Sequence, residues 1–331
     1  MTRPSLGVDL VDDALEVVLR ERLAVVESEL AAAVASDDAF VTEAARHVLT
    51  AGGKRFRPLV VLLAAEFGDP DAPGVLAAAL VVELTHLATL YHDDVMDEAT
   101  VRRGSPSANA RWSNSVAIMV GDYLFARASD IVSDLGPDAV RIQARTFSRL
   151  VQGQIRETVG PAADTDPYQH YLSVVADKTA SLVATSARFG AMFAGASGDV
   201  VDVLTEFGER LGTAFQLSDD VLDVASDSTE SGKTPGTDLR EGVPTLPVLI
   251  ARASADPAGA RLRELLGGDL TDDTRRTEVL RLLRADPSMA GARSEVTRWS
   301  DSARSLLGRL PAGAARDALH ALCDLVISRT S

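Results

Sequence analysis

The sequence predicts an all-α fold, a single domain built as a bundle of long antiparallel helices. Apolar residues, mainly Ala, Leu and Val, recur at spacings of three and four, and the alternation typical of strands is missing. Several of these periodic segments exceed 20 residues, whereas an average helix has about 11 or 12. Short connections between such long helices favour antiparallel packing in a bundle.

Helix-breaking residues separate the expected helices in order. Gly52-Gly53 follows the second helix and Asp69-Pro70 the third, and a Gly-Ser-Pro segment at 104–106 follows the fourth. Gly-Pro pairs at 136–137 and 160–161 separate the next three, and a Gly/Pro-rich segment at 231–236 follows the eighth. The expected helices span 10–35, 40–50, 59–67, 74–98, 108–135, 138–159, 168–195 and 200–224.

Several of these helices are apolar nearly all round, so we expect them to be central. From residue 256 onward the expected helices shorten and carry more arginine. This change indicates an outer layer rather than a second domain. We therefore expect one domain over residues 1–331, with its core at about 51–247 and outer helices at 256–331.

Composition limits the possible partners and compartments. The 331 residues include 33 Lys and Arg against 48 Asp and Glu, a formal net charge of −15, which disfavours nucleic acid and anionic membranes as partners. The single cysteine, Cys323, excludes an intramolecular disulfide and a cysteine zinc site. The longest uncharged run has eleven residues, 72–82, so we expect no transmembrane segment. The first 13 residues lack a signal peptide's apolar block, and a cytoplasmic location is expected.

Two similar acidic segments, HDDVMD at 92–97 and SDDVLD at 218–223, end long apolar helices. On a helix, Asp93 shares a face with Asp97, and Asp219 with Asp223. At about 6 Å and an effective dielectric of about 20, each like-charge pair costs roughly 2 to 3 kcal/mol. A solvated helix end could explain one such cluster, but two indicate a bound cation. Carboxylate ligands suit Mg²⁺, which takes phosphate oxygens as its other ligands.

Cations suited to phosphate accompany the acidic segments. GGKRFRP at 52–58 places Lys54 and Arg57 where a Gly-Gly turn opens a helix, and free backbone amides there attract anions. His86, two turns before Asp93, could donate to a diphosphate or be structural. Gln216, three residues before Asp219, could reach the same ligand. Each cation taken singly could also be an ordinary surface residue. The remaining candidates are Arg102, Arg103, Lys178 with Thr179, and Lys233.

These motifs together resemble the trans (head-to-tail, E-type) polyprenyl diphosphate synthases over about residues 51–247. The shared motifs are GGKRFRP, HDDVMDEATVRRG, GDYLFA, Lys178-Thr179, FQLSDDVLD and GKTPGTDL, and the two DDxxD motifs with GGK are highly specific. The resemblance implies helices around a deep central cavity with the motifs facing each other, and a homodimer. It also implies a prenyltransferase that joins isopentenyl diphosphate to an allylic diphosphate (geranyl, farnesyl or geranylgeranyl).

The resemblance assigns a role to each matched residue. Asp94, Asp220 and Asp223 would support the metal ligands, and Lys178 and Lys233 would take part in catalysis with them. Val243 stands where many relatives carry a further lysine. Isopentenyl diphosphate would be held by Lys54, Arg57, His86 and Arg103. The allylic diphosphate would be held through three Mg²⁺ on Asp93, Asp97 and Asp219, assisted by Arg102, Lys178, Thr179, Gln216 and Lys233. The segment 231–236 would be a lid that excludes water.

The helix face preceding Asp93 bears on product length. Its residues are small or of moderate size for 15 positions, about 22 Å of helix, whereas the family's C15 and C20 enzymes tend to place aromatic residues here. We therefore expect a long product (about C30 to C50), as in quinone side chains, with hand-off to a membrane. Small residues could instead serve close packing, with a plug supplied by Met119, Tyr123 or Phe125. The face comprises Thr89, Ala88, Thr85, Val82, Val81 and Ala78.

Three alternatives remain open at this point. A short-chain farnesyl or geranylgeranyl diphosphate synthase would share every motif. A terpene cyclase or head-to-head synthase usually lacks the GGK segment, which is present here. A non-catalytic subunit that binds prenyl diphosphates would be expected to lack an aspartate, but all six are present.

Overall fold

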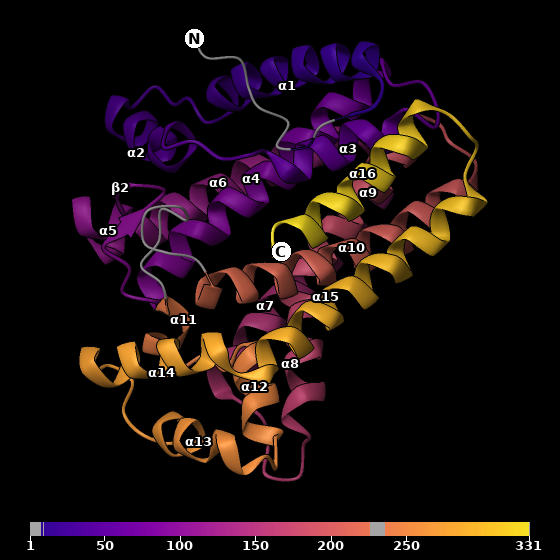
Figure 1. Cartoon of the computed structure of the whole chain (residues 1–331). Coiled ribbons are helices and arrows are strands. Elements are labelled where there is room, and N and C mark those ends of the chain that lie inside the picture. Colours follow the sequence, from indigo (N-terminus) through magenta and orange to yellow (C-terminus); the bar gives the residue numbers. More distant parts are fainter. Residues whose placement is uncertain (1–7, 9, 226–235, 331) are drawn as a thin grey trace. The chain divides into compact units, whose positions relative to one another are not determined.

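The computed structural model describes residues 8, 10–225 and 236–330. Over these residues the chain is helical almost throughout, which confirms the all-α prediction (Figure 1). The strands of this part of the chain are β1 (Val101–Arg102) and β2 (Ser105–Pro106), which pair as a short antiparallel hairpin. The hairpin was not expected from the sequence. Its turn places Arg103 and Gly104 at φ values of 53° and 76°.

The described chain divides into two compact units. Unit 1 takes its residues from Met1–Ser148, Leu182–Gly208 and Leu306–Leu322, and unit 2 from Arg149–Ser181, Glu209–Ser305 and Cys323–Ser331. The first aspartate motif and the GGK segment belong to unit 1, and the second aspartate motif and Lys178 to unit 2. A single domain over residues 1–331 stays a prediction.

Unit 1 contains the N-terminal helices, and local capping sets where several of them begin. The side chain of Asp12 accepts a hydrogen bond from the Leu15 amide and that of Asp38 from the amides of Phe40 and Val41. Its helices are α1 (Asp13–Ala33), α2 (Ala39–Thr50), α3 (Phe56–Ala65), α4 (Pro73–Met96), α5 (Ala108–Arg111) and α6 (Asn114–Asp134), with parts of α7 (Pro137–Val159), α9 (Ser181–Phe193), α10 (Gly198–Ala225) and α16 (Ala314–Ser328) and the 3₁₀ turn Leu307–Arg309.

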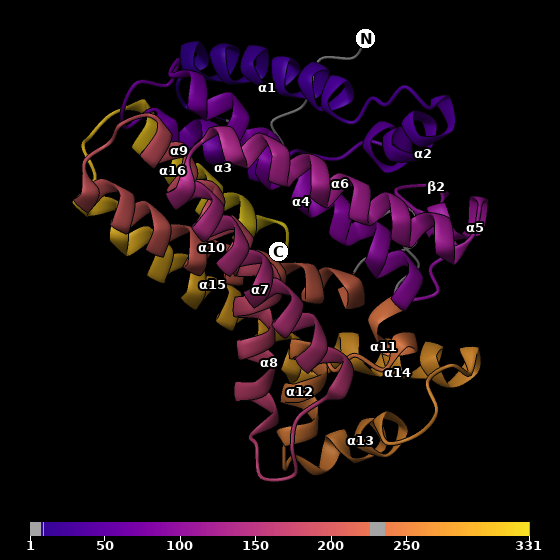
Figure 2. The ribbon, with the colours of Figure 1, turned by 180° about the vertical axis from the view of Figure 1, so that it is seen from behind.

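Helices α4 and α6 lie side by side in unit 1 (Figures 1 and 2). A Cβ added to Gly121 of α6 would lie 2.2 Å from Nε2 of His92 on α4, so only glycine allows this approach. α4 is the one described helix long and apolar enough to cross a membrane by length and composition, with 72% of the relevant window buried. The buried core helix of a folded domain has the same length and composition, so α4 is weak evidence for a membrane span.

Two expected helices are interrupted. The range 108–135 divides into α5 and α6 because Ser113 has extended backbone and caps α6 through the Val116 amide. The range 168–195 contains a π-helical turn, Ala176–Ala180, between α8 (Pro167–Val175) and α9. Neither interruption contains Gly or Pro, the residues on which the sequence prediction of breaks relied.

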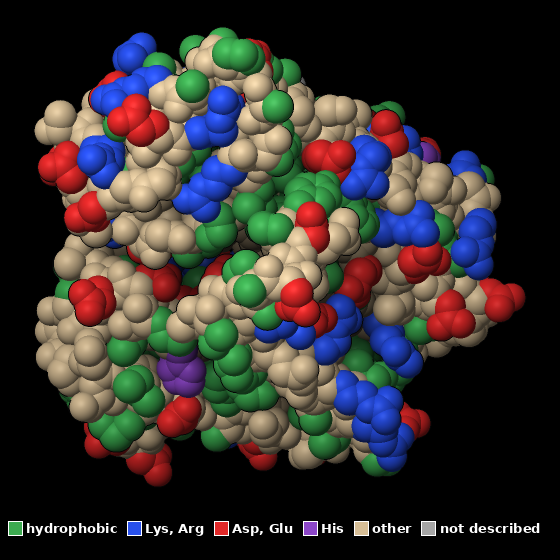
Figure 3. Space-filling view, turned by 90° about the horizontal axis from the view of Figure 1, so that it is seen from below, with side chains coloured by type: hydrophobic (Ala, Val, Ile, Leu, Met, Phe, Trp, Pro, Cys, Tyr) green, Lys and Arg blue, Asp and Glu red, His purple; other side chains and the backbone are tan. Residues whose placement is uncertain are grey.

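Unit 2 contains most of the C-terminal helices. After residue 256, helices α13, α14 and α16 have 7, 13 and 15 residues, which agrees with the expected shortening, but α15 has 20. Charges of both signs are interspersed on the face shown in Figure 3. In this unit, Arg261 of α13 pairs with Glu264 and with Glu278 of α14. Besides α8 and parts of α7, α10 and α16, the unit contains α11 (Thr237–Glu241), α12 (Leu246–Ala253), the 3₁₀ turn Pro257–Gly259, α13 (Ala260–Leu266), α14 (Asp273–Ala285) and most of α15 (Pro287–Leu306).

Candidate functional site

The Gly-Gly turn between α2 and α3 brings two guanidinium groups together. Gly52 and Gly53 have φ values of 101° and 143°, which favour glycine. A Cβ on Gly53 would lie 2.8 Å from Nη1 of Arg103 and 2.9 Å from Nη1 of Arg55. The glycines therefore permit both the turn and the approach of these two arginines.

Arg55, between the predicted ligands Lys54 and Arg57, is buried and paired. Its guanidinium donates to Glu27 of α1 at 2.5 Å and to Glu83 of α4 at 3.0 Å. Burial by itself lowers the pKa of Arg55, but the two carboxylates raise it above the usual value. Arg55 thus anchors the turn, while Lys54 is exposed. In the sequence, Glu83 interrupts an apolar segment of α4. A carboxylate at such a position indicates a buried cation as its partner.

His86, Arg57 and Arg103, which the resemblance assigned to isopentenyl diphosphate, lie close enough in unit 1 for both arginine charges to act on His86. The pKa of His86 lies well below its usual value because burial removes its solvation and the charges of Arg57 and Arg103 repel an imidazolium. The pKa of Arg103 is also lowered, first by burial. Arg103 donates through Nη1 to the carbonyl oxygen of Gly52. Concentrated positive charge with a neutral imidazole donor suits a diphosphate.

The depressed pKa of His86 predicts a pH dependence of folding. An unfolded histidine takes up a proton near pH 6.5, whereas folded His86 stays neutral. The free energy of unfolding should therefore rise with pH through about pH 5 to 6.5, with a slope from this group of at most about 1.4 kcal/mol per pH unit. Urea denaturation of the wild type and His86→Gln across this range measures it. Identical slopes would contradict the prediction.

The first aspartate motif lies at the C-terminal end of α4. Asp97 caps the helix, and its amide donates to the carbonyl oxygen of Asp93 at 2.8 Å. Asp94 is fully buried, and its Oδ1 accepts from Nε and Nη2 of Arg102 at 2.6 and 2.5 Å. Burial raises the pKa of Asp94, and Arg102 only partly offsets this. Asp94 therefore orients Arg102, which the resemblance assigned to the allylic diphosphate; that role stays a prediction.

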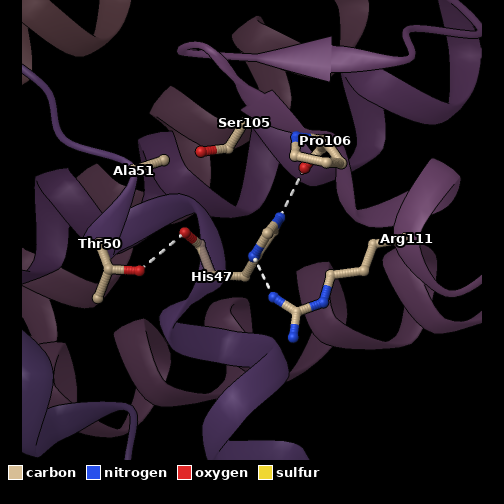
Figure 4. Close-up of a pocket in the computed structure, with 6 residues that line it drawn as sticks. All are labelled: His47, Thr50, Ala51, Ser105, Pro106 and Arg111. Carbon is tan, nitrogen blue, oxygen red and sulfur yellow. Dashed lines mark hydrogen bonds between the residues drawn. The ribbon is translucent and has the colours of Figure 1, made fainter.

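A pocket of about 480 Å³ lies beside the turn but contains none of the predicted ligands (Figure 4). His47 Nε2 is 2.7 Å from the carbonyl oxygen of Pro106, and Nη1 of Arg111 is 3.2 Å from His47 Nδ1. One neutral tautomer of His47, protonated at Nε2, satisfies both contacts. The other lining residues are Thr50, Ala51 and Ser105.

The predicted product face of α4 is buried in unit 1. Ala88 and Thr85 are 0% exposed, and Thr85 Oγ1 accepts a hydrogen bond at 2.6 Å from Nε2 of Gln143 on α7. Phe125, one of the possible plugs, stacks 4.3 Å from Phe147 and 5.7 Å from His92, measured between ring centroids. Gln143 thus contacts this face directly, and Phe125 lies against His92, one helical turn after Ala88.

The other two possible plugs point elsewhere. Met119 is 61% exposed. The hydroxyl of Tyr123 donates to the carbonyl oxygen of Ala35, near the end of α1, at 3.0 Å. The ring of Phe125, in contrast, lies against His92 of α4.

In unit 2, the second aspartate motif begins with an ion pair. Asp219 Oδ1 accepts from Nη2 of Arg329 at 2.5 Å, and the guanidinium of Arg329 lies 4.7 Å from the ring centroid of Phe215. The residue after Arg329 is also bonded: the carbonyl oxygen of Thr330 accepts a hydrogen bond from Nε of Arg293 at 2.6 Å. Sequence reasoning missed Arg329, because 110 residues separate it from Asp219 and no motif marks it. A metal ion at Asp219 would compete with this arginine.

Asp220 is buried within the second motif, and its predicted supporting role stays a prediction. It accepts from the Tyr171 hydroxyl at 2.5 Å and from Nε2 of Gln216 at 2.9 Å. Burial, with the nearby charge of Asp238, raises the pKa of Asp220 to about 7. The Thr179 hydroxyl donates to Oε1 of Gln216 at 2.9 Å. Thr179 and Gln216, both predicted to contact substrate, are therefore joined to each other.

Of the two predicted catalytic lysines, the structure describes Lys178 but not Lys233. Lys178 lies in the π turn and pairs with Glu157 of α7. Lys233 and most of the predicted lid, 231–236, lie outside the described residues.

The aspartates fit a divalent ion only with ligands from outside the protein. In the part of the chain that is described, no group of three His, Cys, Asp or Glu side chains could hold a metal ion. Asp93 and Asp97 supply carboxylate oxygens from one helix end. Mg²⁺ commonly binds one or two carboxylates and completes its shell with water and substrate phosphates. The donor set therefore fits Mg²⁺ shared with a phosphate ligand.

Comparison with known proteins identifies the family. A family model described as polyprenyl synthetase matches residues 38–283. Nonaprenyl diphosphate synthase of Mycobacterium tuberculosis is 50% identical over 324 residues, which cover 98% of this chain and 97% of the relative. Geranylgeranyl pyrophosphate synthase from Corynebacterium glutamicum, solved with calcium and isoprenyl diphosphate, is 47% identical with a TM-score of 0.86, covering 98% of this chain and 99% of that one.

A second solved structure extends the likeness. Polyprenyl synthase from Caulobacter crescentus CB15, also complexed with calcium and isoprenyl diphosphate, has a TM-score of 0.88 at 31% identity and covers 100% of both chains. The family model spans well over half of the sequence, and the relatives match it nearly end to end. The chain therefore belongs to the polyprenyl synthetase family.

Proposed function

We propose that the protein is a Mg²⁺-dependent prenyltransferase that condenses isopentenyl diphosphate head-to-tail with an allylic diphosphate. The product is an all-trans polyprenyl diphosphate of about C30 to C50, of the kind used for quinone side chains. The observation that carries the proposal is the cluster of Arg57, His86 and Arg103 on the unit that also carries Asp93 and Asp97. Cations for one diphosphate and carboxylates for a metal-bound second one match a reaction between two diphosphates.

The basic cluster would bind isopentenyl diphosphate. Arg57 and Arg103 neutralise its charge, and neutral His86 donates a hydrogen bond. Lys54, exposed on the same turn, adds a further charge-assisted contact. Arg55 holds the Gly-Gly turn in place through its ion pairs with Glu27 and Glu83. The diphosphate is thus held while the alkene end remains free to react.

The aspartate motifs would hold the allylic diphosphate. Asp93, Asp97 and Asp219 would bind Mg²⁺, which we expect to number three ions. When bound, Mg²⁺ supplies electrostatic stabilisation of the diphosphate as a leaving group. Asp94 and Asp220 orient neighbours of these ligands: Asp94 holds Arg102 and Asp220 holds Gln216. No protein nucleophile is needed, because the isopentenyl alkene attacks the allylic carbon as diphosphate leaves. Loss of a proton to the departing diphosphate then restores a double bond.

The long product is supported by two observations. The α4 face before Asp93 carries buried residues of small or moderate size, including Ala88 and Thr85, and a relative at 50% identity is named nonaprenyl diphosphate synthase. A relative at 47% identity is named geranylgeranyl pyrophosphate synthase, so a C20 product is the outcome to test against.

One assay tests the function. Purified full chain, Mg²⁺, labelled isopentenyl diphosphate and each of geranyl, farnesyl and geranylgeranyl diphosphate are incubated, and products are sized by chromatography. We expect extension to C30 or longer. Products ending at C20 would replace the long-chain assignment with a short-chain one, and no incorporation of label would overturn the enzyme assignment.

We further propose a cytoplasmic homodimer that hands its product to a membrane. Ile118 and Met119 on α6 are 43% and 61% exposed, and a dimer interface would bury such side chains. Light scattering on the purified chain measures the mass. A monomer at working concentration would contradict the dimer.

A further inference from the structure

The π turn at Ala176–Ala180 is the most irregular part of the long helix that carries Lys178. The Ser181 amide donates to the carbonyl oxygen of Ala176, five residues back, while Val175 and Ser181 keep ordinary helical dihedral angles. The helix therefore continues through the turn with one extra residue. π turns are rare and occur frequently at functional sites, and this one contains both Lys178 and Thr179.

Asp177 ties this turn to helix α7. Its Oδ1 accepts from Nε of Arg149 at 2.7 Å, and its Oδ2 accepts from Nη2 of Arg156. Arg149 also reaches the carbonyl oxygen of Ala176 at 3.4 Å. The Ser181 hydroxyl donates to the Asp177 carbonyl oxygen at 2.6 Å. One carboxylate thus binds two arginines of a neighbouring helix at the point where the helix is least regular.

The backbones of α7 and the π turn are also in close contact. A Cβ added to Gly153 would lie 2.6 Å from the Lys178 amide nitrogen and 3.0 Å from its Cα. Arg149, Gly153 and Arg156 lie at positions i, i+4 and i+7, on one face of α7. The two arginines therefore hold Asp177 from either side of the contact. The backbone position of Lys178 is set by this arrangement.

The two residues after Asp177 have partners of their own. Lys178 pairs with Glu157, and Thr179 donates to Gln216, which in turn donates to Asp220 of the second aspartate motif. The Asp177 carboxylate is occupied by Arg149 and Arg156, so its influence on Lys178 and Thr179 passes through the backbone of the turn. We infer that Asp177 is a positioning residue for the allylic substrate: by binding Arg149 and Arg156 it holds the π turn that presents Lys178 and Thr179. This inference rests on the proposed function.

Glu209 of α10 offers a matched control. It binds the same guanidinium as Asp177, accepting from Nη2 of Arg149 at 2.5 Å and from Nη1 at 3.2 Å. Glu209 lies outside the π turn. Asp177→Asn and Glu209→Gln each remove one negative charge from Arg149 with little change in shape, so both variants share any effect of weakening an Arg149 ion pair. Only Asp177→Asn should weaken binding of the allylic substrate.

The experiment compares both variants with the wild type as full chains. Steady-state kinetics give KM for the allylic diphosphate and for isopentenyl diphosphate, and hydrogen exchange reports on the amides of residues 178–181. For Asp177→Asn we expect about a tenfold rise in the allylic KM, the loss of one charge-assisted contact, with an unchanged isopentenyl KM. We also expect faster exchange at 178–181. For Glu209→Gln both KM values and the exchange of these amides should match the wild type.

Arg156→Gln provides a second variant, because it removes one of the two contacts of Asp177 and leaves Arg149 with Glu209. We expect a smaller rise in the allylic KM, so the inference stays testable if Asp177→Asn does not fold. Equal rises in both KM values, or the same allylic effect in Glu209→Gln, would overturn it. A wild type without turnover would refute the proposed function instead, and unchanged exchange in Asp177→Asn would by itself overturn the positioning role.

Discussion

Asp93→Ala is expected to lower turnover by about a hundredfold or more while the protein folds normally. Asp93 and Asp97 are stacked one helical turn apart at the end of α4. Without a cation they repel each other, so removing one should leave the melting temperature without Mg²⁺ equal or higher. Steady-state rates as a function of Mg²⁺ concentration, with thermal unfolding in parallel, measure both effects.

Asp130→Ala is the matched control for this prediction. Asp130 is an exposed carboxylate of α6, 3.0 Å from Nη1 of Arg127, and it belongs to none of the shared motifs. Its removal should leave turnover and Mg²⁺ dependence unchanged. If Asp93→Ala kept more than a few per cent of the activity with wild-type Mg²⁺ dependence, Asp93 would not be a metal ligand.

Asp219→Ala, in the second motif, is expected to lower turnover as much as Asp93→Ala does but to change the melting temperature differently. Asp219 is paired with Arg329, whose side chain is 19% exposed. Asp219→Ala removes this partner, so the structure predicts a slightly lower melting temperature than the wild type. From the sequence alone, relief of repulsion would predict an equal or higher value. The contrast between Asp93→Ala and Asp219→Ala therefore measures the effect of Arg329.

Ala88→Phe is expected to shorten the product to C15 or C20 while the first condensations proceed at nearly the normal rate. Ala88 lies one turn before His92, so it shares the side of α4 that contacts α6. It is fully buried. If Ala88 lines the product's path, a rigid ring there should block the growing chain, because neighbouring side chains cannot yield much. Product sizing by chromatography with a farnesyl diphosphate starter checks the result.

Overpacking must be separated from blocking in this experiment. Ala88→Val adds little volume and should keep the long product, and thermal unfolding of both variants reports any loss of stability, about 1 to 3 kcal/mol for an overpacked core. An Ala88→Phe enzyme that makes the wild-type product at the wild-type rate would show that this helix face does not line the product's path. The long-chain assignment would then rest on the relatives alone.

The fold was largely predictable because helix periodicity and breaking residues act over a few positions. The expected helices at 40–50, 138–159 and 200–224 agree with α2, α7 and α10 to within two residues. The π turn was not predictable, because residues 176–180 carry no Gly or Pro and lie inside a continuous apolar pattern. The hairpin at 101–106 was missed for a similar reason, since two-residue strands are too short to show alternation.

The sequence by itself determined the all-α class, the placement of both aspartate motifs at helix ends, and the glycine-rich turn with its cations. These depend on spacing along one helix or turn. Only the tertiary structure decided how each charge is used, because pairing and burial depend on residues far apart in the chain. Arg55 and Arg57 look equivalent in sequence, yet Arg55 is neutralised by Glu27 and Glu83. Likewise, packing alone brings Arg329 to Asp219.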